Sequence, residues 1–195
     1  MADPNRNAAI WYSADGYDPK SKGINGRRVA GESFLRGFLQ HVDADRLQAI
    51  VAGGNGAKEF ATLARPFANG RPIAPIHIYN NPAPEPINAV HYPAPNIAPE
   101  AWRRYHHGQT AFSLTGVTHT TATANIMQAM FDLRAAPVEE WDGLICTSKS
   151  VLDQVRYQFD LFDDYAAQRF GTKSPPQPQT TLIPLGVHTQ DFTKN

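Results

Sequence analysis

The chain has 195 residues, enough for one domain with a sizeable core, and its 18 basic side chains balance 18 acidic ones. The balanced charge gives no indication of a nucleic-acid or anionic-membrane partner. The single Cys146 excludes an internal disulfide, the N-terminal residues lack a signal-peptide pattern and no apolar run reaches about 20 residues, so we expect a cytoplasmic protein without a transmembrane segment.

The first half of the chain alternates apolar runs with helical patterns. The predicted strands of this half are residues 8–14, 46–53, 75–80 and 88–93. The predicted helices cover 58–67, 98–106 and a segment after residue 28 whose apolar face is Phe34, Leu35, Phe38, Leu39 and Val42. Nine of the sixteen prolines fall between Pro66 and Pro99, but this region is too apolar for a flexible linker. We expect it to form an ordered wall and place no domain boundary in it.

The central stretch, residues 112–130, carries the main candidate for chemistry. An apolar run over 110–114 predicts a strand that breaks at Gly116, and a helix follows with Ile126, Met127, Met130 and Leu133 on one face. The turn between them contains one titratable side chain, His119. Because ligands of open α/β sheets bind outside the carboxyl ends of the strands, His119 is placed for an active-site role, with capping of the following helix as the structural alternative.

The last third of the chain repeats the alternation. Residues 143–147 predict a buried strand, Ser148 the N-cap of a long amphipathic helix that ends at Gly171, and residues 180–184 the final strand. Six or seven strands alternating with five helices predict the α/β class, with a doubly wound, mostly parallel sheet in one domain over residues 1–195.

Two weaker candidate sites are also present. Gly23, Gly26, Arg27 and Arg28 precede a helix, where backbone N–H groups and the helix dipole favour phosphate, although a solvated turn explains them about as well. Asp15 ends the first predicted strand, either as a substrate-binding group or as a turn residue. The pair at residues 106–107 is explained by polar histidines at a helix end, because no carboxylate or Cys stands at ligand spacing to it.

The segments WDGLICTSKSVLDQV and TTLIPLGVHTQDF resemble the end of the N-terminal domain in family-four glycosyltransferases. That family has the GT-B architecture of two Rossmann-like domains, and its usual pattern is a strand ending in Ser, a helix, and a strand ending in Pro-x-Gly-Val-Asp. Here His188 stands in place of that Asp. The glycine-containing loop at residues 23–26 and His119 also match the pattern, and the resemblance is specific over 141–152 and 182–192.

The resemblance implies a retaining transfer of a sugar from a nucleotide-sugar donor to an acceptor hydroxyl, without a metal or other cofactor. By position, Gly23, Gly26, Arg27 and Arg28 would contact the donor diphosphate, and His119 would meet the transferred sugar. We assign acceptor contacts to four residues near the predicted strand ends, Asp15, His91, Tyr92 and Thr118. In the family a C-terminal domain binds the nucleotide sugar; it is absent from residues 1–195, so we expect this part alone to be inactive.

Two other functions remain open from the sequence. One is half of a nucleotide-sugar epimerase of GT-B shape, which would need catalytic carboxylates at strand ends, a place that only Asp15 occupies. The other is a non-catalytic module that binds a carbohydrate or a partner subunit.

Overall fold

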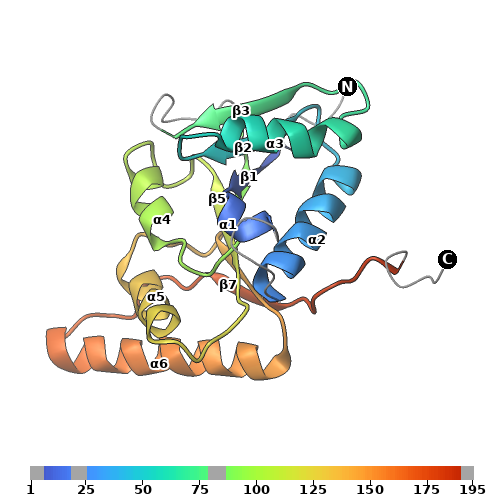
Figure 1. The fold of residues 1–195 in the computed structure, drawn as a ribbon. Coiled ribbons are helices and arrows are strands. Elements are labelled where there is room, and N and C mark those ends of the chain that lie inside the picture. Colours follow the sequence, from blue (N-terminus) through green and yellow to red (C-terminus); the bar gives the residue numbers. More distant parts are fainter. Residues whose placement is uncertain (1–6, 19–25, 79–86, 190–195) are drawn as a thin grey trace. The chain divides into compact units, whose positions relative to one another are not determined.

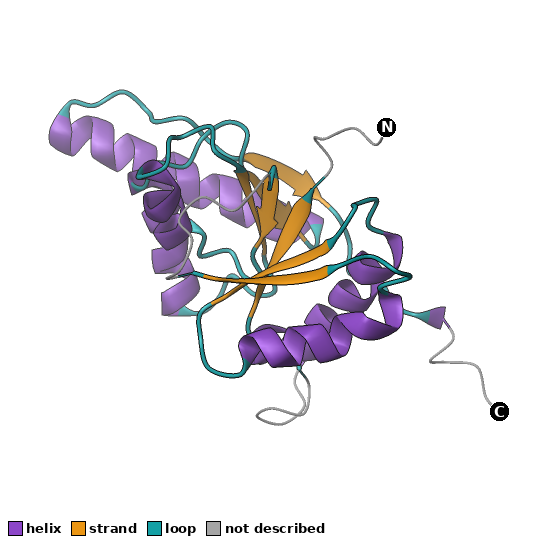
Figure 2. Cartoon of the chain, turned by 90° about the horizontal axis from the view of Figure 1, so that it is seen from above, coloured by secondary structure: helices purple, strands orange, loops and turns teal. Residues whose placement is uncertain are grey.

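The computed structural model describes residues 7–18, 26–78 and 87–189 (Figure 1). Its strands are β1 (Ala8–Tyr12), β2 (Leu47–Val51), β3 (Ile73–His77), β4 (Ala89–His91), β5 (Ser113–Val117), β6 (Gly143–Cys146) and β7 (Gln179–Leu182). Its helices are α1 (Ala14–Tyr17), α2 (Gly26–His41), α3 (Gly56–Ala64), the 3-10 turn η1 (Arg65–Phe67), α4 (Ala98–Tyr105), α5 (Ala124–Ala135) and α6 (Lys149–Phe170). Figure 2 shows strands and helices in separate colours.

The strands form one seven-stranded sheet in the order β3-β2-β1-β4-β5-β6-β7. Neighbours pair in parallel at β1–β2, β2–β3, β4–β5, β5–β6 and β6–β7. Parallel neighbours need crossover connections, and helices provide them between most successive strands. The predicted α/β class with a doubly wound, Rossmann-like sheet is confirmed.

The chain falls into two compact units. The first comprises Met1–Ile87 with Leu185–Asn195, and the second comprises Asn88–Pro184. The boundary after residue 87 lies inside the proline-rich region, where the sequence analysis placed none. The single domain over residues 1–195 stays a prediction. In the described residues, no helix is long and apolar enough to cross a membrane.

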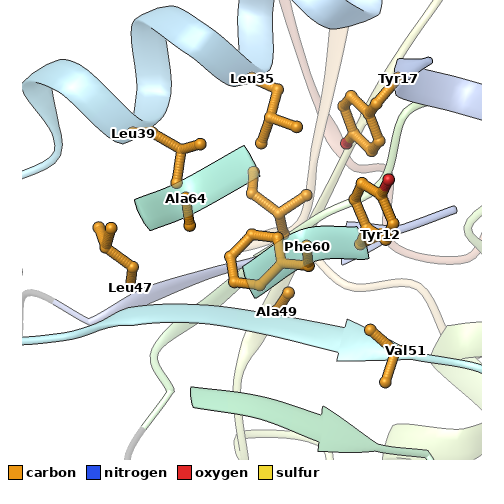
Figure 3. Close-up of a cluster of buried hydrophobic side chains, with 10 residues drawn as sticks. Tyr12, Tyr17, Leu35, Leu39, Leu47, Ala49, Val51, Phe60 and Ala64 are labelled. Atoms are coloured by element: carbon orange, nitrogen blue, oxygen red, sulfur yellow. The ribbon is translucent and has the colours of Figure 1, made fainter. Parts of the chain in front are cut away.

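The core of the first unit lies between β2 and the helices α2 and α3 (Figure 3). Alternate residues of β2 point to this core, because successive strand side chains face opposite sides of a sheet. Helices contribute apolar side chains spaced by four residues, which share one helical face. The cluster consists of Ile10, Tyr12, Tyr17, Leu35, Leu39, Leu47, Ala49, Val51, Phe60 and Ala64.

A close approach of backbones joins α1 to α2 in the first unit. A Cβ atom added at Gly31 of α2 would lie 2.0 Å from the carbonyl oxygen of Gly16 in α1. Any larger residue at position 31 would therefore push the two helices apart. The contact also brings Tyr17 over Tyr12, with parallel rings 5.9 Å apart between centroids. The short helix α1 is thereby fixed against the core.

The second unit contains β4 to β7 and the helices α4, α5 and α6. Buried ion pairs connect its helices to its loops. The guanidinium of Arg104 in α4 is fully buried and binds both carboxylate oxygens of Asp142, just before β6. Asp142 also accepts hydrogen bonds from the backbone N–H groups of Leu114 and Glu139. One carboxylate thus holds α4, β5 and the start of β6 together.

A second buried pair ties the two long helices of this unit to the connection that leads to β7. Arg134 of α5 binds both oxygens of Asp163 in α6 and also donates to the carbonyls of Pro175 and Pro176. The proline-rich connection is therefore anchored by side-chain donors, which compensates for its lack of backbone ladder bonds.

Helix α6 confirms the predicted boundaries most closely. The Ser148 hydroxyl accepts from the Val151 N–H at 3.2 Å, as an N-cap does. At the other end Gly171 adopts a left-handed conformation, φ 66°, and donates to Ala167. Strand β6, this cap, α6 and β7 reproduce the predicted strand–serine–helix–strand order.

Three of the sequence predictions about strand limits and apolar faces are wrong. The first strand ends at Tyr12 instead of residue 14, and residues 14–17 form a helix. The central strand covers 113–117, three residues later than predicted, so Gly116 lies within it. A Cβ at Gly116 would lie 2.8 Å from the carbonyl oxygen of Ala94, so glycine is required there by a packing contact and not by a turn. Among the predicted apolar faces, Phe34 and Met127 are exposed.

Candidate functional site

In the second unit, a histidine pair lies at the carboxyl ends of neighbouring strands. His91 is the last residue of β4 and is paired in register with Thr115 of β5. Its ring Nδ1 shares a hydrogen bond of 3.0 Å with the Thr115 hydroxyl. His119 is half-buried and follows the end of β5 by two residues. The β4–β5 pairing therefore brings together two of the predicted site residues, and Thr115, which the sequence analysis did not single out, joins them.

The environment of His91 keeps its imidazole neutral. Its side chain is 8% exposed. Burial is the main cause that lowers its pKa to about 4, and the charge of nearby His119 adds to the effect. At neutral pH, His91 can thus offer one N–H donor and one nitrogen acceptor without adding a positive charge beside His119.

Thr118 anchors the start of the loop between β5 and α5. It is fully buried, and both its backbone N–H and its hydroxyl donate to the carbonyl of Ile145 in β6, at 2.9 and 3.1 Å. These bonds extend the β5–β6 pairing beyond Val117 and set the point at which His119 leaves the sheet. This geometry favours positioning of His119 over the predicted contact between Thr118 and an acceptor.

Two further polar side chains follow β4: Tyr92, which was predicted as a site residue, and Glu100, which was not. Tyr92 donates its backbone N–H to Thr115, and its ring is half-buried. Burial raises the pKa of the Tyr92 hydroxyl, and Glu100 raises it further. Glu100 is itself buried in the first turn of α4 and accepts from Arg103 at 3.1 Å. Burial raises the pKa of this carboxyl despite the guanidinium. The sequence feature that could have pointed to Glu100 is its place directly after Pro99, where an acidic residue is common at the start of a helix.

In the first unit, Asp15 is bound by two arginines. Its carboxylate accepts from Arg28 at 2.7 Å and from Arg27. The prediction that these arginines precede the helix is wrong, because α2 starts at Gly26 and both lie in its first turn. Hydrogen bonds from Arg28 and then Arg27 lower the pKa of Asp15 to about 2. One of the two positive charges is therefore compensated locally. Gly26 starts α2 with open space around it, whereas Gly23 lies outside the described residues.

The predicted site residues thus form two groups. Asp15, Gly26, Arg27 and Arg28 belong to the first unit, and His91, Tyr92, Thr118 and His119 to the second.

Other reactive side chains have structural surroundings. Cys146 is buried in β6, and burial raises the pKa of its thiol, which disfavours a nucleophilic thiolate. His188, which replaces the acidic residue of the family pattern, donates from Nε2 to the Ser33 carbonyl of α2, both in the first unit. Within residues 7–18, 26–78 and 87–189, no three His, Cys, Asp or Glu side chains are grouped as metal ligands.

Comparison with protein families, curated proteins and solved structures gives no match for this chain.

Proposed function

We propose that this chain is the N-terminal, acceptor-side domain of a cytoplasmic GT-B glycosyltransferase that moves a sugar from a nucleotide-sugar donor to an acceptor hydroxyl with retention of configuration. The observation that carries the proposal is the pair of His119 and neutral His91 at the carboxyl ends of β5 and β4. The proposal also rests on the family motif, whose segment forms β6, the Ser148 cap, α6 and β7.

The pair suits a reaction in which the protein positions reactants and stabilises charge. In the family's usual mechanism the leaving phosphate helps to deprotonate the acceptor hydroxyl, so no protein nucleophile is needed. His119 is half-buried, and the hydrogen bonds of the adjacent Thr118 to the Ile145 carbonyl fix the backbone from which it extends. A donor fixed in this way stabilises developing charge better than a flexible side chain.

The donor-phosphate role of α2 is a separate part of the proposal. The first N–H groups of a helix and its dipole favour an anion. Arg27 and Arg28 add two positive charges at this helix start, and Asp15 holds both guanidiniums in place. In this reading Asp15 orients the arginines and does not itself contact the acceptor.

The epimerase alternative is less well supported. It requires a carboxyl group that exchanges protons at a strand end, and Asp15 was its one candidate. Two arginines lower the pKa of Asp15 to about 2, which makes it a weak base that stays ionised at neutral pH.

The test is a transfer assay with the polypeptide encoded by the whole reading frame that contains this sequence. It is incubated with a panel of nucleotide sugars and a mixture of hydroxyl acceptors, and the release of nucleoside diphosphate and the glycosylated product are measured. We expect one donor to be consumed with formation of a glycoside of the same anomeric configuration. Residues 1–195 alone should leave the donor intact, because the resemblance assigns the nucleotide to a second domain. Failure to consume any nucleotide sugar, or epimerisation without transfer, would contradict the proposal.

A further inference from the structure

Helix α6 carries an exposed apolar ridge on the side that faces away from the core of the second unit. Tyr157, Leu161 and Tyr165 are 63%, 48% and 54% exposed, although each is large and apolar. The buried side of the same helix is formed by Val155, Gln158, Phe159, Asp163 and Ala166. Scattered exposed apolar residues need no explanation, but these three recur at every fourth position. Residues spaced by four form one continuous ridge on a helix surface.

One charged residue lies at each end of the ridge. Four residues before Tyr157 is Asp153, and four residues after Tyr165 is Arg169; both are exposed. The complete ridge therefore runs from an acidic residue through a tyrosine, Leu161 and a second tyrosine to a basic residue. It spans about 24 Å at 1.5 Å per residue. In the part of the chain that the structure describes, neither Asp153 nor Arg169 forms an ion pair.

This order is complementary to itself when reversed. A two-fold axis at Leu161 places Leu161 against its copy, Tyr157 against Tyr165 of the second copy, and Asp153 against Arg169 of the second copy. Two-fold interfaces require such self-complementarity, since the same patch serves both chains. Two ridges of four-residue spacing that pack side by side belong to the commonest class of helix packing, with axes crossing at about 50°.

We propose that α6 is a homodimer interface in which this ridge packs against the same ridge of a second copy. The charge order favours a second copy, because each copy carries both the acid and the base that the opposite ends of its partner require. The apolar centre supplies the buried area, and the terminal ion pairs set the antiparallel direction. The contact is small, so the dimer should be weak and concentration-dependent. The proposal does not depend on the enzymatic function.

The test is sedimentation velocity of the 195-residue chain over a range of concentrations, with a monomer mass of 21.5 kDa as reference. We expect a reversible shift toward twice that mass. Leu161→Glu should abolish the shift, and the matched control Met127→Glu, at a similarly exposed position of α5, should not. Thermal midpoints of all variants verify that they fold.

Charge reversal then tests the register. Asp153→Arg and Arg169→Asp should each weaken self-association about tenfold or more, because each places like charges opposite one another at both ends. A mixture of the two single variants should dimerise as well as the wild type, since the heterodimer restores both opposite-charge pairs. The double variant should also recover.

Four results would overturn the proposal. The wild-type chain could stay monomeric at all concentrations, or its dimer could persist in Leu161→Glu. The reversals could lower the thermal midpoint without changing association, which would assign the charges to the dipole of α6 alone. Finally, a monomer that binds anionic lipid vesicles through Leu161 would assign the ridge to a membrane surface.

Discussion

Replacing Asp142 by Asn should destabilise the protein more than any conservative change at its surface. Its carboxylate accepts four hydrogen bonds: two from Arg104, at 2.5 and 2.8 Å, and one each from the N–H groups of Leu114 and Glu139, at 2.7 and 2.9 Å. An asparagine has one acceptor oxygen, and its NH₂ group would face donors. The guanidinium of Arg104 would be left fully buried beside a neutral amide.

The magnitude follows from these contacts. Removing one partner of a buried ion pair costs about 3–5 kcal/mol, because the remaining charge is uncompensated. Each backbone N–H left without an acceptor adds about 1–3 kcal/mol. Relaxation of the site offsets part of this sum, so we expect a loss of at least about 3 kcal/mol. For a chain of this size that lowers the thermal midpoint by roughly 6 °C or more.

The assay is urea unfolding of Asp142→Asn and of a matched control, Asp132→Asn. Asp132 is exposed and accepts one hydrogen bond from Gln128, so its substitution should change the free energy of unfolding by less than about 0.5 kcal/mol. A double-mutant cycle with Arg104→Met should give a coupling of about 1–3 kcal/mol between Arg104 and Asp142. A loss below about 1 kcal/mol for Asp142→Asn would refute the reasoning that this carboxylate organises the second unit.

Three further outcomes test other parts of the structure. Gly31→Ala should lower the free energy of unfolding by about 1–3 kcal/mol, since its Cβ would overlap the Gly16 carbonyl oxygen; an unchanged urea midpoint would show that α1 moves freely. Ser148→Ala should lower the free energy of unfolding by about 1 kcal/mol, because the Val151 N–H loses its acceptor; an unchanged urea midpoint would show that this cap does not stabilise α6. The folded-state pKa of His91 is about 4, below its unfolded value near 6.5, so the unfolded state binds more protons in this window and stability should fall by about 3 kcal/mol as pH drops from 6.5 to 4. His91→Asn should flatten that part of the pH profile, and a profile that keeps its slope would contradict the assignment.

The sequence was most informative where an element carries its own boundary signals. Ser148 and Gly171 mark the two ends of α6 by local chemistry, and both predictions are confirmed. The alternation of apolar runs and helical patterns likewise predicted the parallel α/β sheet. These signals depend on neighbouring residues, which a sequence displays directly.

The sequence was least informative where distant residues decide the local structure. Gly116 resembles a strand breaker, yet it lies inside β5 because the carbonyl of Ala94 approaches it closely. Asp142 and Arg104 are 38 positions apart, and no periodicity links them. Asp15 had the place of a substrate-binding residue, but only the folded chain reveals that the start of α2 meets it.

In the candidate site, too, the features set by neighbouring residues were predictable and those set by distant residues were not. His119 could be placed after a strand from pattern alone, and it lies there. The neutral state of His91 depends on burial and on Thr115 and His119, which become its neighbours only when β4 pairs with β5. The roles of Gly23, Gly26, Arg27 and Arg28 in binding phosphate stay a prediction.

The most direct test of the proposed function compares His119→Ala with His107→Ala in the polypeptide from the whole reading frame. His107 is a histidine that lies just after α4, away from the strand ends, and serves as the matched control. The two quantities measured are the initial rate of sugar transfer and the thermal midpoint. We expect His119→Ala to lower the rate about 10²–10³-fold with little change in midpoint, as loss of a donor aimed at developing charge does, and His107→Ala to change neither. An unchanged rate with a lowered midpoint for His119→Ala would mean that His119 is structural and would contradict the account.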